Sequence, residues 1–434
     1  MTYKSRYSSN TSKEEKMKKK ICKGLCVLLV CSIGLFTGCQ KNGGNTKKIK
    51  VLNWGTESEG AVWVELAKSF TEKTGIQIDV ETAEWSVYWD KINTLYAAGT
   101  PPEVFAMDAP LFMDWYSRGA LLSLQDFLDK DTEVLSALYP VTLNAYKTDK
   151  GFFGLPRDFQ TIALFYNKDM FDKAGVPYPD ETWTWEDLSI TAKKLIVKDK
   201  SGYYTQWGFA PDLWDVELLM SSLVWSYGGT ILSPDYKKTT IADNMEPWQL
   251  LSKMIIVDKS IPDMDTQAQY GGDLFYAGKA AMTPMGHWSV PQYSSCNFKW
   301  DVVPLPQGPA GRATSVNSAG FVMAKNCKNP EAGWEWIKYV LSAEGQSKLA
   351  ALGFAIPARK DIAQSDVFLN QPVKINHRIF IDALEYAHPK PVFKGYDAWS
   401  NAFGNAMAAI YESDDIAAVM KTAVSDADAS LVKQ

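Results

Sequence analysis

Aromatic and polar side chains occur together in the segments that follow predicted strands of this chain. They are Trp54, Glu57, Glu84, Trp85, Asp108, Asp158, Gln160, Trp214, Tyr227, Trp288, Asn317, Tyr396 and Trp399. The flat apolar face of a sugar ring stacks on an aromatic side chain, while its hydroxyls form hydrogen bonds with carboxylates and amides. Any single tryptophan could equally serve packing. The whole set lies beside turns rather than at helix-core spacing, and it therefore indicates a carbohydrate site.

The sequence motifs of common enzyme classes, by contrast, are absent or incomplete. The segment 272–280 resembles a phosphate-binding loop, but its spacing is one residue too long and Ala280 replaces the required Ser or Thr. The sequence has no GxSxG, HExxH or dinucleotide fingerprint, and its three histidines are scattered. One alternative stays open, because two of the carboxylates above could face each other as the pair that hydrolyses a glycoside.

The stretch from Gly154 to Phe171 combines charged residues with a buried strand. Residues 162–166 are apolar on both faces, which predicts a strand covered on both sides. Arg157, Asp158 and Gln160 precede that strand. Charged groups beside a buried strand are costly unless they are paired or bound. We therefore expect this polar run either to contact a ligand or to hold a connection between two domains.

The elements that position these side chains follow a βα pattern. A strand at 49–54, a helix over 62–70 that stops at Gly75 and a strand at 76–80 form a βαβ unit, which implies a parallel sheet. Further strands are predicted at 104–107, 207–209, 280–284, 301–305 and 320–324. Helices are predicted at 88–96, 111–122, 124–138, from Thr184 onward, 218–225, 250–257, 334–341 and over most of 396–431. The fold class is thus α/β, and such sheets bind ligands in crevices at the carboxyl ends of their strands.

The size and charge of the chain further restrict its number of domains and its possible partners. The chain has 434 residues, 46% of them hydrophobic, which is enough for two sizeable cores. Residues 1–38 hold eight Lys and Arg and two Glu, so the formal net charge of −5 becomes −11 for the rest of the chain. A body this acidic argues against nucleic acid as a partner. Neither a cofactor nor a metal site is expected, since no Cys/His cluster occurs.

The N-terminus is predicted to be a targeting segment. A lysine-rich region precedes the apolar run Leu25–Phe36, which is shorter than the roughly 20 residues that span a bilayer. The run ends in Phe36-Thr37-Gly38-Cys39, which resembles the lipobox of bacterial lipoproteins, although the usual leucine is Phe36 here. We expect a signal peptide over 1–38, lipidation at Cys39 and a flexible tether over 39–47. An ordinary cleaved signal peptide is the alternative, and Met17 is the more typical start.

Cys296 and Cys327 are the two cysteines that follow Cys39. They could form a disulfide in an oxidising compartment, or they could be two separate buried thiols. Their spacing does not decide between these states.

Five segments together resemble the extracellular solute-binding proteins of sugar ABC transporters, the family that includes maltose-binding protein. They are 163–169, Thr184–Leu188, 275–282 leading to Gly286-His287-Trp288, 318–321 and 353–358. They occur in the order of the family behind the lipobox, and the resemblance covers nearly the whole mature chain. The resemblance implies two α/β lobes that close on a ligand about hinge crossings, a type II binding-protein fold.

The resemblance also implies boundaries. Lobe 1 would comprise 48–158 with 318–358, and lobe 2 would comprise 163–314 with 365–434. The chain would cross between the lobes near 158–162, 315–318 and 357–364.

By the same resemblance, ten residues would contact ligand without catalysis. Glu57 and Asp108 are similar to polar contacts from lobe 1, and Trp214, Trp288 and Trp399 are similar to stacking aromatics from lobe 2. The residues expected on other loops that face the cleft are Trp85, Asp158, Tyr227, Asn317 and Tyr396.

The partners implied are a carbohydrate, the permease subunits of an ABC transporter and the membrane through the lipid at Cys39. We expect a monomer at the extracellular face of the cell membrane. A lipid-anchored glycosidase and a binding protein for a non-sugar solute are the alternatives. Because Arg157, Arg312 and Arg359 could bind an acid group, an acidic sugar remains an alternative ligand. The number of aromatic residues favours an oligosaccharide over a monosaccharide.

Overall fold

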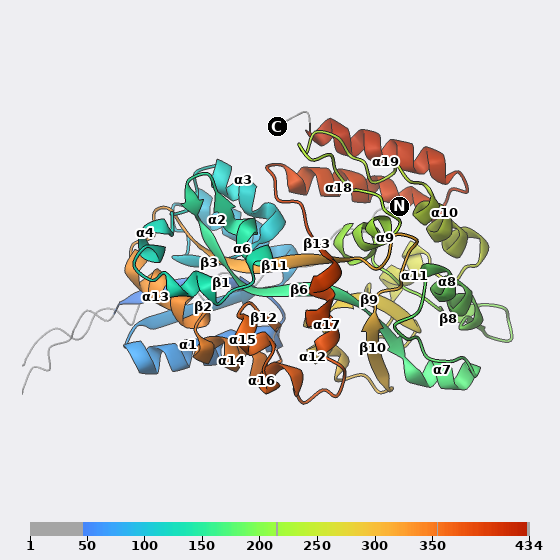
Figure 1. Cartoon of the computed structure of the whole chain (residues 1–434), viewed down its shortest axis with the longest axis horizontal. Coiled ribbons are helices and arrows are strands. Elements are labelled where there is room, and N and C mark those ends of the chain that lie inside the picture. The colour runs from blue at the N-terminus through green and yellow to red at the C-terminus, as the bar shows by residue number, and fades with distance from the viewer. Residues whose placement is uncertain (1–46, 214–215, 354, 432–434) are drawn as a thin grey trace, which may run out of the picture. The chain divides into compact units, whose positions relative to one another are not determined.

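The computed structural model describes residues 47–213, 216–353 and 355–431 (Figure 1). The predicted signal peptide, the lipidation site Cys39, residues 39–46 of the tether and Trp214 therefore lie outside the described residues. Within the described ranges, no helix is both long enough and apolar enough to cross a membrane.

The N-terminal βαβ unit is present as predicted. Strand β1 (Lys48–Trp54) pairs in parallel with β2 (Gln77–Ala83), from Lys48 opposite Gln77 to Trp54 opposite Ala83. Helix α1 (Glu57–Thr74) connects them. Thr56 and Glu59 form a capping box at its start, which satisfies backbone N–H groups that a helix end leaves unpaired. Gly75 ends the helix in the left-handed conformation, with φ of 74°.

The following segment has shorter helices than predicted. Helix α2 (Trp85–Ala97) and strand β3 (Val104–Asp108), which is parallel to β1, agree with the prediction. The two long helices expected over 111–138 are instead short turns of helix. These are η1 (Ala109–Leu111), α3 (Phe112–Ser117), α4 (Gln125–Leu128), α5 (Glu133–Ser136), α6 (Pro140–Leu143) and η2 (Asn144–Tyr146). Gly119, with φ of 67°, breaks the first of the predicted helices.

Strand β6 (Gly154–Asn167) is fourteen residues long and joins the two halves of the main sheet. Its first half pairs with β11 (Thr314–Met323) and β12 (Ile356–Pro357), and its second half pairs with β9 (Met282–Gly286) and β10 (Trp300–Pro304). The predicted strand at 162–166 is thus only the second half of β6. The polar run lies inside the strand rather than before it.

The sheet is mixed rather than parallel. Its main path runs β10-β6-β11-β3-β1-β2, and β9, β12 and β13 (Ala387–Pro389) pair off that path. Strands β9, β10 and β11 are all antiparallel to β6, which corrects the expectation of a parallel sheet throughout. The strand predicted at 207–209 is a single bridge between Trp207 and Ala280. Two small hairpins, β4 (Lys147–Thr148) with β5 (Gly151–Phe152) and β7 (Val197–Lys198) with β8 (Tyr204–Gln206), stand apart from the main sheet.

Helices cover the second half of the chain. Thr184 forms the expected N-cap of α8, again with a capping box. The helices are α7 (Lys168–Ala174), α8 (Trp185–Lys194), α9 (Ser221–Ser226), α10 (Glu246–Ser252), α11 (Met264–Gln269), α12 (Val290–Tyr293), α13 (Pro330–Val340), α14 (Ala343–Ala351), α15 (Lys360–Ala363), α16 (Asp366–Leu369), α17 (Arg378–Asp382), α18 (Tyr396–Met407) and α19 (Ile416–Leu431). Two π-helical turns, Val216–Met220 and Lys253–Val257, adjoin α9 and α10.

Separate hydrophobic cores define two lobes. The core of lobe 1 contains β1, α1 and β3 together with α13, and its buried residues fall within 49–155 and 321–358. Lobe 2 has one main cluster beneath α18 and α19, which includes Met282 of β9. A third cluster around β10, α12 and α17 lies mainly in lobe 2 but also includes Ala350 and Ile356. Figure 1 shows β6 and β11 passing between these two groups of elements.

The two cysteines do not pair. Cys296 packs against a core of lobe 2 and Cys327 against the core of lobe 1, and both are free thiols. Of the two states that the sequence left open, the structure has the separate thiols.

Tyr146 forms hydrogen bonds with both β3 and β11, and its ring leaves no space for a side chain at Gly320. The Tyr146 hydroxyl lies 2.9 Å from the Met107 carbonyl oxygen and 2.8 Å from that of Ser318. A Cβ at Gly320 would lie 2.6 Å from Tyr146 Cζ and 2.7 Å from the carbonyl oxygen of Leu155. Because neither neighbour is a flexible side-chain end, this site has no room for a methyl group.

We predict that Gly320→Ala lowers the free energy of unfolding by about 1–3 kcal/mol, because the core is overpacked. Denaturant unfolding measures this loss. Gly60→Ala on α1 is the matched control, since its Cβ would be 3.2 Å from Thr82 Oγ1 and alanine favours the helix. Equal stability of the two variants would contradict the packing described here.

Candidate functional site

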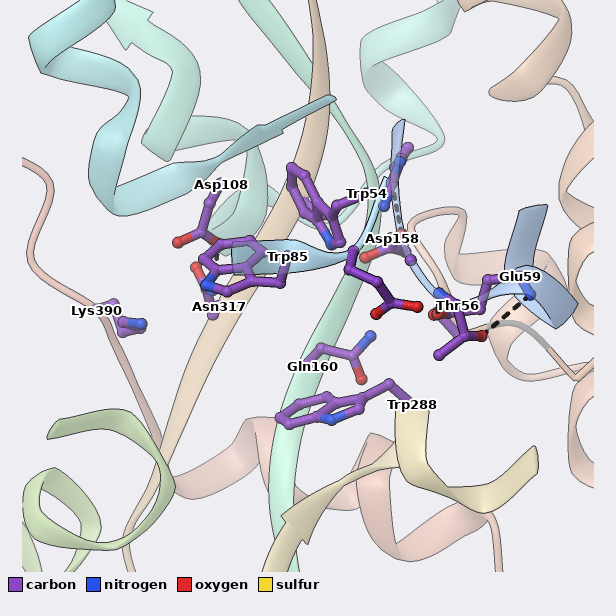
Figure 2. A pocket seen from close by; sticks show the side chains of 15 residues that line it. Trp54, Thr56, Glu59, Trp85, Asp108, Asp158, Gln160, Trp288, Asn317 and Lys390 are labelled. Carbon is purple, nitrogen blue, oxygen red and sulfur yellow. Dashed lines mark hydrogen bonds and ion pairs between the residues drawn. The ribbon is translucent and has the colours of Figure 1, made fainter. Parts of the chain in front are cut away.

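A cavity of about 340 Å³ lies where β6 and β11 pass beside the carboxyl ends of β1 and β3 (Figure 2). Trp54 ends β1, Glu84 and Trp85 follow β2, and Asp108 ends β3. The cavity is thus at the strand ends where the sequence predicted it. Its lining residues are Trp54, Gly55, Thr56, Glu59, Glu84, Trp85, Asp108, Arg157, Asp158, Gln160, Trp288, Asn317, Ala319, Ala355 and Lys390.

Tryptophans reach the cavity from both lobes. Trp54 and Trp85 of lobe 1 pack edge to face with ring centroids 5.1 Å apart, and Trp85 remains 45% exposed. Trp288 of lobe 2 follows β9, and Figure 2 shows Gln160 between it and the lobe 1 pair. Gly286 sets the position of Trp288, because a Cβ there would come within 1.7 Å of the Trp288 ring. Aromatic side chains from both lobes at one cavity suit a flat apolar ligand surface.

A buried ion pair lies at the floor of the cavity. Arg157 Nε donates to Asp158 Oδ2 at 3.0 Å, and Arg157 Nη1 donates to Asn53 Oδ1 at 2.7 Å. The guanidinium carbon also lies 4.8 Å from the ring centroids of Trp54 and of Trp63. These contacts compensate the cost of removing the guanidinium from water.

The backbone of β6 explains how adjacent charged residues fit at this point. Asp158 pairs with Ala319, but Pro156 pairs with Gly320, so Arg157 is the extra residue of a β-bulge. A bulge changes the direction of the side chains beside it. Arg157 can therefore reach Asn53 in lobe 1 while Asp158 lines the cavity.

Burial raises the pKa of the Asp158 carboxyl to about 6. The charge and hydrogen bond of Arg157 and the backbone N–H of Ala319 oppose this shift, while the Glu59 carboxylate adds to it. Asp158 is therefore ionised at neutral pH but takes up a proton in mildly acidic solution.

Two buried acceptors at the cavity have no hydrogen-bond partner within the described protein. Asn317 Nδ2 donates to Asp108 Oδ1 at 2.7 Å, which leaves Asn317 Oδ1 unpaired, and Gln160 Oε1 is also unpaired. Buried polar atoms are nearly always satisfied. Both side chains also line the cavity, and an amide group can exchange hydrogen bonds with the hydroxyl groups of a sugar.

The structure brings five of the ten predicted ligand residues to this cavity. They are Trp85, Asp108, Asp158, Trp288 and Asn317. Glu57 is exposed at the first turn of α1, next to the lining residue Thr56. Tyr227 ends α9 outside the lining, and its carbonyl accepts a hydrogen bond from Asn244 Nδ2 at 3.1 Å.

Tyr396 and Trp399 lie in the core of lobe 2 rather than in the cavity lining. They are on the inward face of α18, with exposed fractions of 5% and 0%, and pack against Phe393. Trp399 Nε1 donates to Thr239 Oγ1 at 2.9 Å, which satisfies its one polar group. The spacing of these aromatics is that of a buried helix face, so the stacking role expected of Trp399 does not match its position.

The lining also includes residues that the list of ligand contacts omitted. Trp54 and Gln160 stood among the candidate aromatic and polar residues, and Arg157 was part of the polar run. The sequence did not indicate that Lys390 is near the site, because this residue follows a three-residue strand and lies between two prolines. It reaches the cavity only through the pairing of β13 with β11.

Two of the three arginines that could have bound an acidic ligand interact with groups outside the cavity lining. Arg312 Nε donates to the Leu305 carbonyl oxygen at 2.8 Å, and Arg359 forms an ion pair with Asp361. Among the described residues, no group of three or more His, Cys, Asp or Glu could hold a metal ion.

Two α/β lobes that share strands, with a polar and aromatic cavity at their junction, define a ligand-binding protein of the two-lobe class. A sequence model of the bacterial extracellular solute-binding proteins matches residues 54–347. The chain belongs to this family. Its members are the substrate-binding proteins of ABC transporters and not enzymes, so a glycosidase activity is not expected of this cavity.

Individual proteins agree with this assignment. A binding protein of Brucella abortus is 27% identical over 384 residues, which is 86% of this chain and 90% of that protein. The galactooligosaccharide-binding protein of Bacillus subtilis is 23% identical over 77% of this chain and 80% of its own length. The structure of an ABC substrate-binding protein from Listeria monocytogenes in complex with cycloalternan superposes with a TM-score of 0.80. It is 25% identical and covers 90% of this chain and 99% of that one.

We predict that Arg157→Ala lowers the free energy of unfolding at pH 8 by about 3–5 kcal/mol, because it leaves the Asp158 carboxylate buried and unpaired. The loss should be smaller at pH 5, where that carboxyl is protonated. Urea unfolding at both pH values measures it.

Lys73→Ala is the matched control. It removes one partner of the exposed Lys73–Glu344 ion pair, whose side chains are 59% and 42% exposed, and it should cost less than about 1 kcal/mol. If the Arg157 variant were as stable as this control, the ion pair would not have the structural role assigned to it.

Proposed function

We propose that the protein captures a neutral oligosaccharide in the cavity beside β6 and delivers it to the permease subunits of an ABC transporter. The observation that carries this proposal is that one cavity is lined by Trp85 and Trp288 and also by the amide side chains of Gln160 and Asn317, whose oxygens have no partner within the described protein. A sugar presents apolar ring faces and hydroxyl donors in this combination. The names of the Bacillus subtilis and Listeria monocytogenes proteins support a sugar ligand for this chain as well.

The charges around the cavity favour a neutral sugar. Its ionisable lining residues are Glu59, Glu84, Asp108, Arg157, Asp158 and Lys390. Arg157 is tied to Asp158 and Asn53, so it does not offer a separate positive charge to an anion. The carboxylates would repel the acid group of an acidic sugar.

Binding is proposed to close the two lobes. The chain would bend at 158–162 in β6, at 315–318 in β11 and over 357–364, with lobe 1 formed by 48–158 and 318–358 and lobe 2 by 163–314 and 365–434. Trp85 contacts the ligand from one lobe and Trp288 from the other. A ligand that touches both shifts the equilibrium toward the closed form by its extra affinity for that form.

The N-terminal segment would keep the protein near its transporter. Two acyl chains on Cys39 give stable membrane anchoring where a single chain is marginal. The residues that follow would act as a tether that lets a monomeric body face outward.

A glycan panel tests the proposal most simply. The wild type should be stabilised against thermal unfolding by at least one neutral oligosaccharide, since a ligand that binds only the folded state raises its stability. Trp288→Ala should weaken that binding by about 1–3 kcal/mol through loss of ring stacking. The control Tyr203→Ala, at a 73% exposed tyrosine outside the cavity, should bind like the wild type. If no glycan binds, the sugar assignment is wrong.

We predict that the wild-type affinity for the oligosaccharide identified in this panel falls about tenfold between pH 7 and pH 5. Hydroxyl donors bind the ionised form of Asp158, and one pH unit below a pKa of about 6 leaves roughly a tenth of the carboxyl ionised. Calorimetric titration at the two pH values measures the change. Asp158→Asn should bind with the same affinity at both. A wild-type affinity that does not change with pH would contradict this link between the ionisation of Asp158 and ligand binding.

A further inference from the structure

The two residues that precede Trp288 determine where its backbone lies. Gly286 ends β9 and pairs with Ile162 of β6, and the Trp288 ring occupies the space that a side chain at Gly286 would need. The next residue, His287, begins the short helix η5 (His287–Ser289), and its side chain is buried, whereas Trp288 lines the cavity. The contacts that hold the His287 ring therefore also fix the backbone from which Trp288 extends.

Helices α16 and α17 supply the surroundings of the His287 ring. Phe368 of α16 and Phe380 of α17 pack against it, with ring centroids 4.9 Å and 5.1 Å away. His377, the residue before α17, places its Nδ1 atom 3.0 Å from His287 Nε2. Thr161 Oγ1 donates to the Phe380 carbonyl oxygen at 2.7 Å, so α17 is itself fixed to β6. His287 is thus held by an element that is anchored on the long strand.

The direction of the hydrogen bond between the two histidines follows from a third group. His377 Nε2 lies 2.8 Å from the Val373 carbonyl oxygen, which can only accept, so this nitrogen carries a hydrogen. Burial lowers the pKa of both imidazoles, so both are neutral at pH 7 and each carries one hydrogen. His377 Nδ1 is therefore an acceptor, and His287 Nε2 donates to it.

This hydrogen bond is the only one that the described residues offer to the His287 ring. His287 Nδ1 is buried and has no partner among them. A ring that lost the acceptor on His377 would keep a buried N–H group without a partner, which costs free energy. Its lowest-energy position would then change, and the backbone that carries Trp288 would change with it.

We infer that His377 is a positioning residue of the ligand site, because its Nδ1 atom holds the His287 ring and thereby the Trp288 ring. This inference rests on the proposed function, in which Trp288 stacks on a sugar. His377 is not part of the cavity lining, so it acts on the ligand through His287 and Trp288. An aromatic ring that is already held in place binds more tightly than one that must be ordered when the ligand arrives.

The test is a calorimetric titration at pH 7 with the oligosaccharide that the glycan panel identifies. His377→Phe keeps an aromatic ring but removes the acceptor, and it should weaken binding roughly threefold to tenfold. His377→Asn places an amide oxygen near the position of Nδ1 and should restore most of the affinity. Arg378→Ala is the matched control, since it changes the exposed neighbour in α17 and should bind like the wild type.

A second substitution separates positioning of Trp288 from a general structural role. In the Trp288→Ala background, His377→Phe should cause no further loss of affinity, because the ring through which His377 acts is absent. The same fold loss in both backgrounds would overturn the inference, as would wild-type affinity of His377→Phe, and the proposed function would stand in either case. If the wild type binds no oligosaccharide, the proposed function and this inference fail together.

Nitrogen-15 NMR of the wild-type imidazoles provides a measurement that needs no substitution. At pH 7 the spectrum should show hydrogen on Nε2 of both His287 and His377 and none on either Nδ1. Hydrogen on His377 Nδ1 would overturn the inference, because that atom could then no longer accept from His287.

Discussion

Strand β6 is the element on which the rest of the structure depends, because both lobes form hydrogen bonds with it. Its first half pairs with β11 and β12, and its second half with β9 and β10. A strand shared in this way fixes the lobes to one backbone while leaving rotation about a few residues open. The buried ion pair of Arg157 and Asp158 lies near the middle of β6, where the strand passes from lobe 1 to lobe 2. The β-bulge opposite Ala319 and Gly320 makes room there for both side chains.

The same strand forms the floor of the cavity, so the proposed hinge at 158–162 and the proposed ligand site coincide. Arg157 is held by Asn53 and by aromatic rings of lobe 1, whereas Asp158 and Gln160 line the cavity. A ligand bound there would act on the residues about which the lobes are proposed to turn. This arrangement would link capture of a solute to the proposed closure of the lobes, as expected of a solute-binding protein.

The sequence predicted local elements well and long-range pairing less well. The unit from β1 to β2 and the start of α8 were foreseeable, because capping residues and Gly75 mark their ends. The antiparallel partners of β6 were not, since an apolar strand carries no sign of its partner's direction. Strand-end polar residues pointed to Asp108 and Asn317, which the structure places in the cavity lining. Trp399 misled, because a buried helix face and a stacking platform use the same residue type, and Lys390 depends on a distant strand pairing.

The measurement that bears most directly on this account is a crystal structure of the protein with the oligosaccharide that binds most tightly. The account predicts sugar rings against Trp85 and Trp288, with hydroxyl groups within hydrogen-bond distance of Asp158 and Asn317. A sugar bound away from β6, or one that contacts a single lobe only, would contradict it.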